Sequence, residues 1–227
     1  MTFVISLGGS LVVTDNGLNL NFLKELKSFI KQRVDLGDDF FIVVGGGITA
    51  RQYIKAAQSI VSSSAIDQDL IGIRATHLNA ELLRVSLQEL AAPEIIINPE
   101  KIIERKYPVV VAGGYQPGWS TDYVSVLLAR NYQLHTLINL TNIDYVFDCD
   151  PKIHADAKKI EKINWKDFCS LVGDNWEPGM NTPFDPIASR LASSLKLKVA
   201  ILNGNDFLNI NNFLEDQEFK GTIIEDE

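Results

Sequence analysis

The sequence has few of the residues from which proteins build disulfide frameworks, thiolate metal sites or histidine metal sites. Its 227 residues include two cysteines and three histidines. Cys149 and Cys169 are too few for a disulfide framework, and their spacing fits no metal motif, so we interpret both as reduced thiols. The histidines are scattered and have no cysteine or carboxylate partner at ligand spacing. We therefore expect no metal site made by protein side chains.

A basic surplus and a long apolar run are also missing. The chain has 21 Lys and Arg against 29 Asp and Glu, a net charge of -8. The chain therefore has no excess of Lys and Arg that could replace the counterions of a polyphosphate. We expect neither nucleic acid nor an anionic membrane as a partner. No stretch approaches the roughly 18 apolar residues of a membrane helix, and Met1 leads directly into a predicted strand. We expect a cytoplasmic protein whose ligand can still be a small anion, held by local dipoles and a few arginines.

Strands and helices are predicted to alternate along the whole chain. Such alternation is typical of βαβ units with a parallel sheet. We predict a three-layer α/β/α sandwich with a mostly parallel central sheet, and the length and 46% hydrophobic content fit a single domain, residues 1–227. Strands are expected at 3–7, 40–44, 94–98, 109–112, 136–140, 199–202 and 222–224; helices are expected at 21–31, 49–62, 67–90, 99–105, 122–131, 186–195 and 207–215.

Three of the predicted strands run into glycine turns. The turns are Gly8–Gly9, Gly45–Gly47 and Gly113–Gly114, and each leads toward a segment with helical periodicity. Unpaired backbone N–H groups and the helix dipole converge where a strand, a glycine turn and a helix meet, which is how α/β proteins hold anions. One such turn is weak evidence, because many purely structural turns look the same. Three of them together predict a phosphate pocket.

Other polar residues adjoin these turns or occupy similar places. Arg51 lies one turn into the helix that follows the triple glycine. The apolar residues of this helix that are expected to face inward are Tyr53, Ile54, Ala57 and Ile60. Asp69 begins a long helix, where the pattern alone favours a solvated carboxylate over a ligand contact. Residues 141–144 follow a buried strand, the end at which open α/β sheets place ligands. The loop 174–183 is a candidate lid or subunit edge.

Several short motifs occur in one order: GGS after the first strand, GGGxxAR after the second, GxxxxxxTD before a helix, and TNxDxxxxxDP. In this order they resemble the amino acid kinase superfamily, and most closely the archaeal-type uridylate (UMP) kinases, over nearly the whole chain. The resemblance implies transfer of the γ-phosphoryl group of ATP to UMP with Mg²⁺, in pyrimidine biosynthesis and in a homohexamer. It assigns the acceptor mainly to residues 1–135 and ATP mainly to residues 136–227.

The same resemblance implies roles for individual residues. The implied role of Asp69, in holding the UMP ribose, reverses the interpretation from the helix pattern. Arg51 and Asp144 are the catalytic candidates, with Asp144 organising the active-site groups. Phosphoryl transfer needs positioning and charge neutralisation rather than a nucleophile, so none is assigned. ATP would contact Gly9, Ser10, Gly47, Arg51, Thr141, Asn142, Phe147 and Asp150; UMP would contact Gly46, Asp69, Gln116, Pro117, Gly118, Trp119, Ser120, Thr121 and Asp122.

The chain departs from the family pattern at several positions. Ser6 and Ile48 stand where relatives commonly have lysines, and Tyr145 stands where they usually have glycine. A cation missing beside the transferred phosphoryl group weakens stabilisation of the transition state. This keeps open a non-catalytic nucleotide-binding, oxyanion-binding or storage protein, as the molybdenum storage proteins resemble uridylate kinases. The other alternative is a kinase of another small phosphate, such as isopentenyl phosphate, which Asp69 and the 118–122 loop disfavour.

Overall fold

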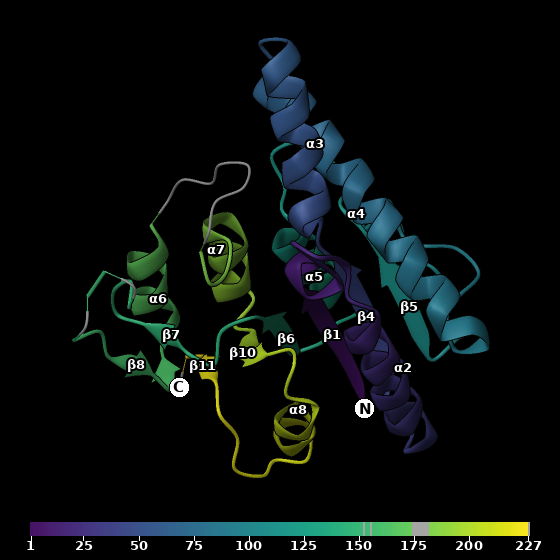
Figure 1. Cartoon of the computed structure of the whole chain (residues 1–227). Coiled ribbons are helices and arrows are strands. Elements are labelled where there is room, and N and C mark those ends of the chain that lie inside the picture. The colour runs from purple at the N-terminus through teal and green to yellow at the C-terminus, as the bar shows by residue number, and fades with distance from the viewer. Residues whose placement is uncertain (152, 155, 174–181, 227) are drawn as a thin grey trace.

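A twisted sheet with helices on both faces occupies the centre of the molecule (Figure 1). The computed structural model describes residues 1–151, 153, 154, 156–173 and 182–226, and this part of the chain contains seven strands in the main sheet. Each pairing is parallel except that of β10 with β11. The strand order is β5 (Val109–Ala112), β4 (Asp39–Val44), β1 (Thr2–Leu7), β6 (Thr136–Thr141), β10 (Lys198–Asn203), β11 (Thr222–Ile224) and β9 (Lys162–Ile163).

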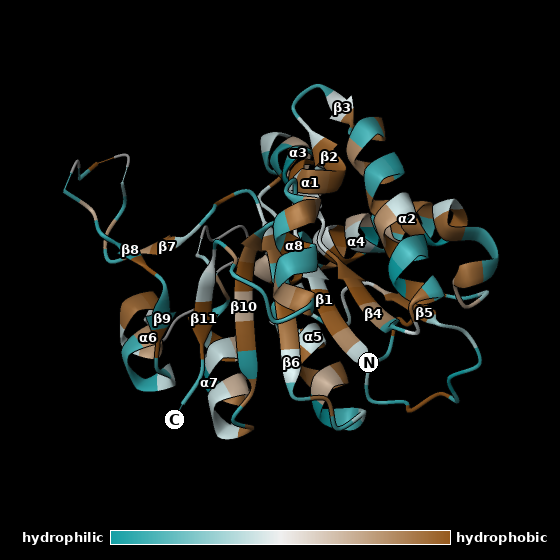
Figure 2. Ribbon diagram, turned by 90° about the horizontal axis from the view of Figure 1, so that it is seen from below, coloured by the Kyte–Doolittle hydropathy of each residue, from teal (hydrophilic) through white to brown (hydrophobic). Residues whose placement is uncertain are grey.

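Two hydrophobic cores lie on opposite faces of the sheet. Alternation along β1 sends Phe3, Ile5 and Leu7 to one face and Val4 to the other. The first face is covered by α2 (Leu20–Asp35), α4 (Ala65–Leu87) and α8 (Phe207–Leu214). The second is covered by α5 (Thr121–Asn131), α6 (Trp165–Val172) and α7 (Pro186–Ser194). The central strands are apolar between the two layers (Figure 2), and the predicted three-layer sandwich is confirmed.

The remaining elements are short, apart from α3. Helix α3 (Gly47–Ile60) forms an antiparallel hairpin with α4, and this hairpin extends beyond the sheet (Figure 1). The other elements are α1 (Gly9–Val12), the hairpin β2 (Val13–Thr14) and β3 (Gly17–Leu18), the 3₁₀ turn η1 (Gln88–Leu90), and the hairpin β7 (Val146–Phe147) and β8 (Lys159–Ile160).

The predicted inward face of α3 was wrong at two positions. Tyr53 is 67% exposed and Ile60 is 84% exposed, whereas Ile54 and Ala57 are half-buried. The structure describes every residue of α3, and none is buried. The reason is that α3 packs on α4 and on the short elements after β1 rather than on the sheet. Only part of the apolar face of α3 is therefore covered by these neighbours, and large side chains on the rest of it are exposed.

The strand predicted at 94–98 and the helix predicted at 99–105 were also wrong. The first segment makes only an isolated bridge between Ile96 and Ala112, and the second contains no helix among its residues, all of which are described. Asn98 accepts a hydrogen bond from the backbone N–H of Glu100, a local turn that competes with helix formation. The Tyr132 hydroxyl bonds both the N–H and the carbonyl of Ile103 and so holds the segment as a loop.

Two predicted helix starts moved by one or two residues. Asn19, not Asn21, caps α2 by accepting from the N–H of Phe22. Ser120 caps α5 by accepting from the N–H of Tyr123, so this helix begins at Thr121. Both residues are standard N-caps whose side-chain oxygen satisfies a free backbone donor. The first turn of α5 lies beside the carboxyl end of β1, where Ser6 donates to Asp122.

Candidate active site

A cavity of about 310 Å³ lies at the carboxyl ends of the central strands. Strand β1 is the point at which the strand order reverses, because β4 and β5 follow on one side of it and β6 and β10 on the other. In open parallel sheets, ligands bind at such a point. The lining comes from the glycine turns after β1 and β4, from α3 and α4, from the start of α5, and from Asn139, Thr141 and residues 182–185.

The glycine turns after β1 and β4 contact each other backbone to backbone. A Cβ on Gly9 would lie 2.4 Å from both the Gly45 carbonyl oxygen and the Gly47 nitrogen. Gly47 has a φ of +56°, and a Cβ there would meet the Gly9 carbonyl carbon at 2.4 Å. Only glycine allows this approach and this backbone conformation. The buried Asn79 of α4 donates to the carbonyls of Gly45 and Gly46 at 2.9 and 3.2 Å, which fixes the second turn.

Helix α4 also holds the loop between β5 and α5. The Thr76 hydroxyl accepts from the N–H of Gly114 at 2.6 Å, and the His77 Nε2 lies 2.7 Å from the Gly114 carbonyl oxygen. Further along, Asp69 Oδ2 accepts from the N–H of Gly118 at 2.7 Å. Asp69 lines the cavity while it makes this bond. One helix thus positions both the triple-glycine turn and the loop that leads to α5.

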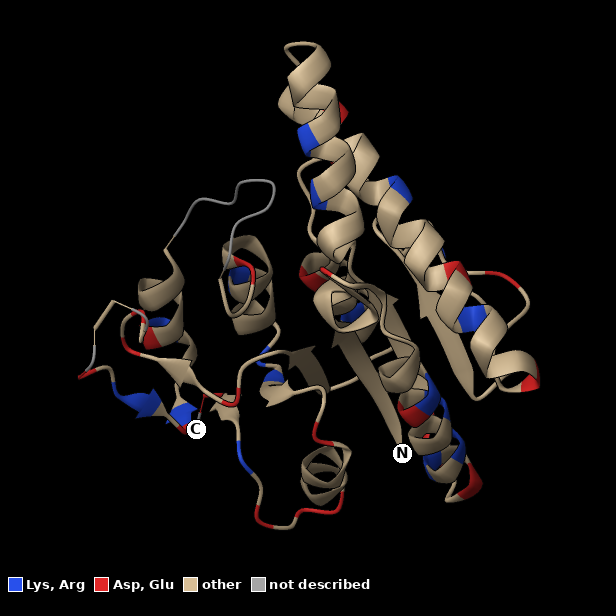
Figure 3. Ribbon diagram, viewed as in Figure 1, with Lys and Arg blue, Asp and Glu red and all other residues tan. Residues whose placement is uncertain are grey.

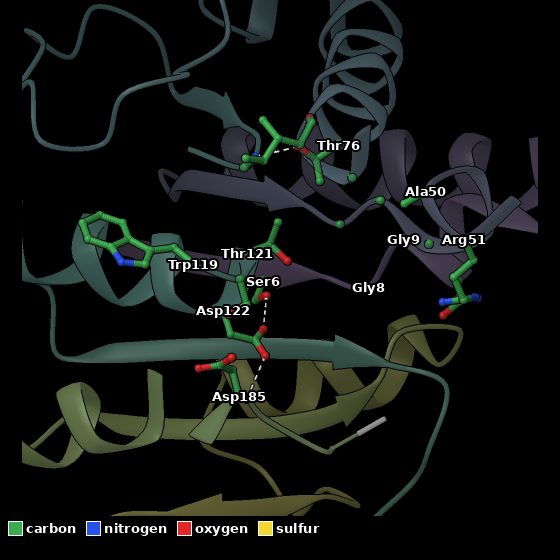
Figure 4. Close-up of a pocket in the computed structure, with 18 of the residues that line it drawn as sticks. Ser6, Gly8, Gly9, Ala50, Arg51, Thr76, Trp119, Thr121, Asp122 and Asp185 are labelled. Atoms are coloured by element: carbon green, nitrogen blue, oxygen red, sulfur yellow. Dashed lines mark hydrogen bonds between the residues drawn. The ribbon is translucent and has the colours of Figure 1, made fainter. Parts of the chain in front are cut away.

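Ser6, Asp122 and Asp185 meet on the far wall of the cavity (Figure 4). The Ser6 hydroxyl donates to Asp122 Oδ1 at 2.7 Å, and the backbone N–H of Asp185 donates to Asp122 Oδ2 at 3.1 Å. Asp185 Oδ1 caps α7 by accepting from the N–H of Ala188. The two carboxyl groups lie side by side in Figure 4, and Arg51 is at the opposite end of the cavity.

The carboxyl groups of this wall are strongly desolvated. Burial raises the pKa of Asp122 to about 6; the neighbouring Asp185 charge adds to this, and the hydrogen bond from Ser6 opposes it. Burial also raises the pKa of Asp185, whereas the N–H groups of Ala188 and Ile187, the hydroxyl of Ser120 and the positive charge of Arg190 lower it. Asp185 Oδ2 is buried and accepts no hydrogen bond of ordinary geometry within the described residues. The wall therefore carries two buried carboxyl groups, one oxygen of which, Asp185 Oδ2, has no hydrogen-bond partner among the described residues.

Most of the residues expected from the sequence surround this one cavity. Asn142, Asp144, Phe147 and Asp150 are not in its lining. Asp144 is exposed and accepts a hydrogen bond from Asn203 at 2.8 Å, and the exposed Gly118 is bonded to Asp69. Gln116 and Pro117 lie next to the lining in sequence. The expected residues in the lining are Gly9, Ser10, Gly46, Gly47, Arg51, Asp69, Trp119, Ser120, Thr121, Asp122 and Thr141.

Sequence reasoning missed several polar residues of the cavity, among them Thr76, Asn139 and Asp185. Asp185 directly precedes the helix predicted at 186–195, and the pattern of aspartate followed by proline at a helix start explains one carboxylate oxygen and says nothing of the other. Thr76 lies in the middle of a helical pattern and carries no sequence signal. Asn139 did carry a sequence signal, because it is a polar residue within the apolar strand β6. Its side-chain amide donates to the Pro183 carbonyl at 2.8 Å.

The candidate lid lies mostly outside the described residues, which resume at Thr182. Thr182 and Pro183 line the cavity. Within the described chain, no three His, Cys, Asp or Glu side chains converge as a metal-ligand group. No described helix has the length and apolar character needed to span a bilayer.

The fold and the cavity together define a phosphate-binding α/β protein, with glycine turns meeting at the reversal point of a parallel sheet. The sequence matches the model of the amino acid kinase family over residues 1–203, and the chain belongs to this family. It is 36% identical to a uridylate kinase of Methanococcus aeolicus, with 99% of each chain covered. The resemblance found in the motifs is thereby confirmed.

Two solved structures share this fold. The crystal structure of a uridylate kinase from Archaeoglobus fulgidus matches 99% of this chain and 100% of its own, with a TM-score of 0.82 at 32% identity. The UMP kinase from Bacillus anthracis matches 100% of this chain and 96% of its own, with a TM-score of 0.77 at 23% identity, which supports the fold alone.

Proposed function

We propose that this protein is an ATP-dependent uridylate kinase, which transfers the γ-phosphoryl group of ATP to UMP and forms UDP and ADP in pyrimidine nucleotide biosynthesis. The observation that carries the proposal is the contact of Gly9 with Gly47 at the base of one cavity. Two turns without side chains allow two phosphate groups to approach each other from adjacent strands. Similarity to uridylate kinases over the whole chain supplies the substrates.

The division of the chain into a UMP-binding part, residues 1–135, and an ATP-binding part, residues 136–227, is part of the proposal. On the UMP side it uses Gly46, Asp69 and the loop 116–122, which α4 holds in place. On the ATP side it uses Gly9, Ser10 and Gly47 with the segment Thr141 to Asp150. Arg51 and Thr141 line the cavity from the two parts, which supports a shared site.

The chemistry asks for alignment and charge neutralisation rather than a base. A UMP phosphate is already ionised at neutral pH and needs no proton removed before it attacks. Among the described residues that line the cavity, Arg51 is the only arginine or lysine, so it supplies the protein's positive charge at the phosphates. The start of α5 adds backbone N–H groups and the positive end of a helix dipole. We propose Asp122, on the wall of the cavity, for the organising role at the centre; Asp144, which is exposed and outside the lining, is the residue to which the resemblance gives that role.

Mg²⁺ is the divalent cofactor of this proposal. The donor set fits it, because Asp122 and Asp185 offer hard oxygen ligands and Asp185 Oδ2 is buried without a hydrogen bond in the described chain. These two residues would hold the ion on the wall of the cavity. When bound, Mg²⁺ neutralises negative charge on the phosphates. The protein's own share is to place the acceptor, exclude water and keep the donor phosphates in line.

An ADP-release assay with Mg-ATP and a panel of acceptors tests the function. UMP should give turnover, and CMP, dUMP, AMP and isopentenyl phosphate measure the acceptor range. Turnover with isopentenyl phosphate alone would move the protein to the other kinase activity. Nucleotide binding by calorimetry without turnover on any acceptor would instead support the non-catalytic binding or storage protein. The comparisons favour the nucleotide kinase over both.

We further propose a homo-oligomer, and specifically a hexamer, in the cytoplasm. Large apolar side chains are exposed on the α3–α4 hairpin, where charged residues are sparse along the outer half (Figure 3). An exposed apolar surface of this kind on a hairpin that projects from the body is typical of an association surface. The exposed residues are Tyr53, Ile60, Val61, Ile66, Leu70, Leu78 and Val85.

A further inference from the structure

The hairpin β7–β8 carries two aromatic side chains on the face that points away from the core. Val146 is buried, pairs with Ile160, and donates its backbone N–H to the Thr222 hydroxyl at 2.9 Å. Side chains alternate along an extended chain, so Tyr145 and Phe147 lie on the opposite face from Val146. Both rings are half-buried. The inner face thus fixes the hairpin to the core, and the outer face presents a partly exposed aromatic surface.

A lysine completes the outer face of the hairpin. Lys159 is the cross-strand partner of Phe147, and directly opposed residues of two strands share a face. Its Nζ lies 4.7 Å from the centroid of the Tyr145 ring, a cation–π contact. The same Nζ is paired with Glu161 Oε1 at 2.7 Å. The ammonium group therefore rests on the ring and restrains it, and Figure 3 shows basic residues along β8.

The outer face of the hairpin follows the cavity in the chain. Thr141 ends β6 and lines the cavity, and Tyr145 follows four residues later, at most about 14 Å along the chain. Strand β6 lies on one side of β1, whereas β5, from which the loop 116–122 leads, lies on the other (Figure 1). Asp144 accepts a hydrogen bond from Asn203 of β10, which ties this connection to the sheet. A nucleotide whose phosphates lie at the glycine turns can therefore reach β7–β8 with its base.

We propose that Tyr145 binds the base of the phosphoryl donor by stacking, and that Lys159 holds the ring in place for this contact. The inference rests on the proposed function, which supplies the donor and assigns Phe147 to it. Glycine, the usual residue at position 145 in relatives, offers no ring, so this contact is an addition made by this chain. The ring makes Tyr145 a second aromatic neighbour of the base beside Phe147.

Stacking determines which donors the outer face of the hairpin accepts. Every base has a π-face, so contact with a flat ring stabilises adenine and guanine alike and reads the edge of neither. We therefore expect Tyr145 to raise the affinity for ADP and for GDP by the same factor. Any preference between the two purines has to come from hydrogen bonds made elsewhere in the site.

Calorimetric titration of the full chain with Mg-ADP and with Mg-GDP tests the proposal without turnover. Tyr145→Ala should weaken the binding of both diphosphates by about tenfold or more. Tyr145→Phe keeps the ring and should bind both as the parent chain does. Lys159→Met keeps the apolar stem but removes the charge, and it should weaken binding by about two- to fivefold.

Two matched substitutions away from the hairpin serve as controls. Tyr107→Ala removes an exposed ring from the loop before β5, and Lys162→Met removes a charge on β9 that is paired with Glu225. Neither residue lines the cavity, and both substitutions should leave the two affinities unchanged. In the kinase assay, Tyr145→Ala should raise the KM for ATP by the factor that calorimetry gives and leave the KM for UMP as it is.

Unchanged binding of Mg-ADP by Tyr145→Ala would overturn the proposal. Tighter binding would overturn it too, because the ring would then obstruct the base rather than support it. Equal rises in the KM for ATP and for UMP, together with a lower unfolding temperature, would reduce Tyr145 to a structural role and refute the donor contact. Diphosphate binding that follows the expected pattern without UMP turnover would refute the proposed function alone.

Discussion

At the scale of single residues, Gly47 combines a steric and a conformational requirement that can be separated. Gly47→Ala places a methyl group 2.4 Å from the backbone of Gly9 in addition to straining a φ of +56°. The strain alone costs roughly 1–2 kcal/mol of the free energy of unfolding. We expect a larger loss than this, measured by denaturant unfolding, together with a strong fall in kcat/KM.

Gly37→Ala is the control for this prediction. Gly37 has a φ of +91°, but a Cβ there meets no atom within 4 Å. It therefore reports the conformational cost without the clash, and kinase activity should be unchanged. If both variants lose the same stability and keep full activity, close approach of the two turns is not needed for function.

Arg51 is the other residue whose role can be isolated. Arg51→Ala removes the only basic side chain among the described lining residues, and we expect kcat/KM for UMP phosphorylation to fall about 100-fold or more. The melting temperature should barely change, because Arg51 is exposed. Lys55→Ala, one turn further along the same exposed helix and outside the lining, should leave the kinetics unchanged. Equal kinetics in Arg51→Ala and the parent chain would remove Arg51 from the site.

At the scale of elements, α4 links the acceptor loop to the phosphate turns. Asn79→Ala would remove the side-chain donor to the Gly45 carbonyl and leave the Gly46 carbonyl with only the Ala50 N–H, at a cost of about 1–3 kcal/mol in the free energy of unfolding. The KM for nucleotide should rise with it, since the turn is no longer held. Ser86→Ala on the same helix removes a hydroxyl that bonds only the Leu82 carbonyl, and it should change neither quantity measurably. A stability loss in Asn79→Ala with unchanged KM would limit this residue to a structural role.

The elements also show what a sequence can and cannot predict. Strands buried on both faces, such as Val109 to Ala112, are continuous apolar runs and were predicted correctly. The wrong helix at 99–105 depended on a hydrogen bond from Tyr132, a residue about thirty positions away, which no local pattern contains. The glycine turns could be predicted because the property that the site needs, the absence of a side chain, is visible in the residue type itself. The place of Asp185 in the cavity could not be predicted, because a helix cap is a sufficient reason for an aspartate at that position. Only the fold shows that Asp122 lies beside it.

At the scale of the whole molecule, the α3–α4 hairpin predicts how chains associate. Ile60 is 84% exposed at the end of α3 and contributes little to the core of its own chain. Ile60→Glu should therefore leave the unfolding temperature of the isolated chain nearly unchanged. A buried and unpaired charge at an interface is costly, so the variant should reduce the oligomer mass measured by light scattering after gel filtration.

Leu208→Glu makes the same change at another exposed position. Leu208 is 74% exposed on α8, away from the hairpin, and its substitution should not alter the mass. If Leu208→Glu dissociates the oligomer and Ile60→Glu does not, the association surface lies on the α8 side. A parent chain that elutes as a monomer would instead mean that the apolar side chains of the hairpin are solvated, and the active site would then be complete within one chain.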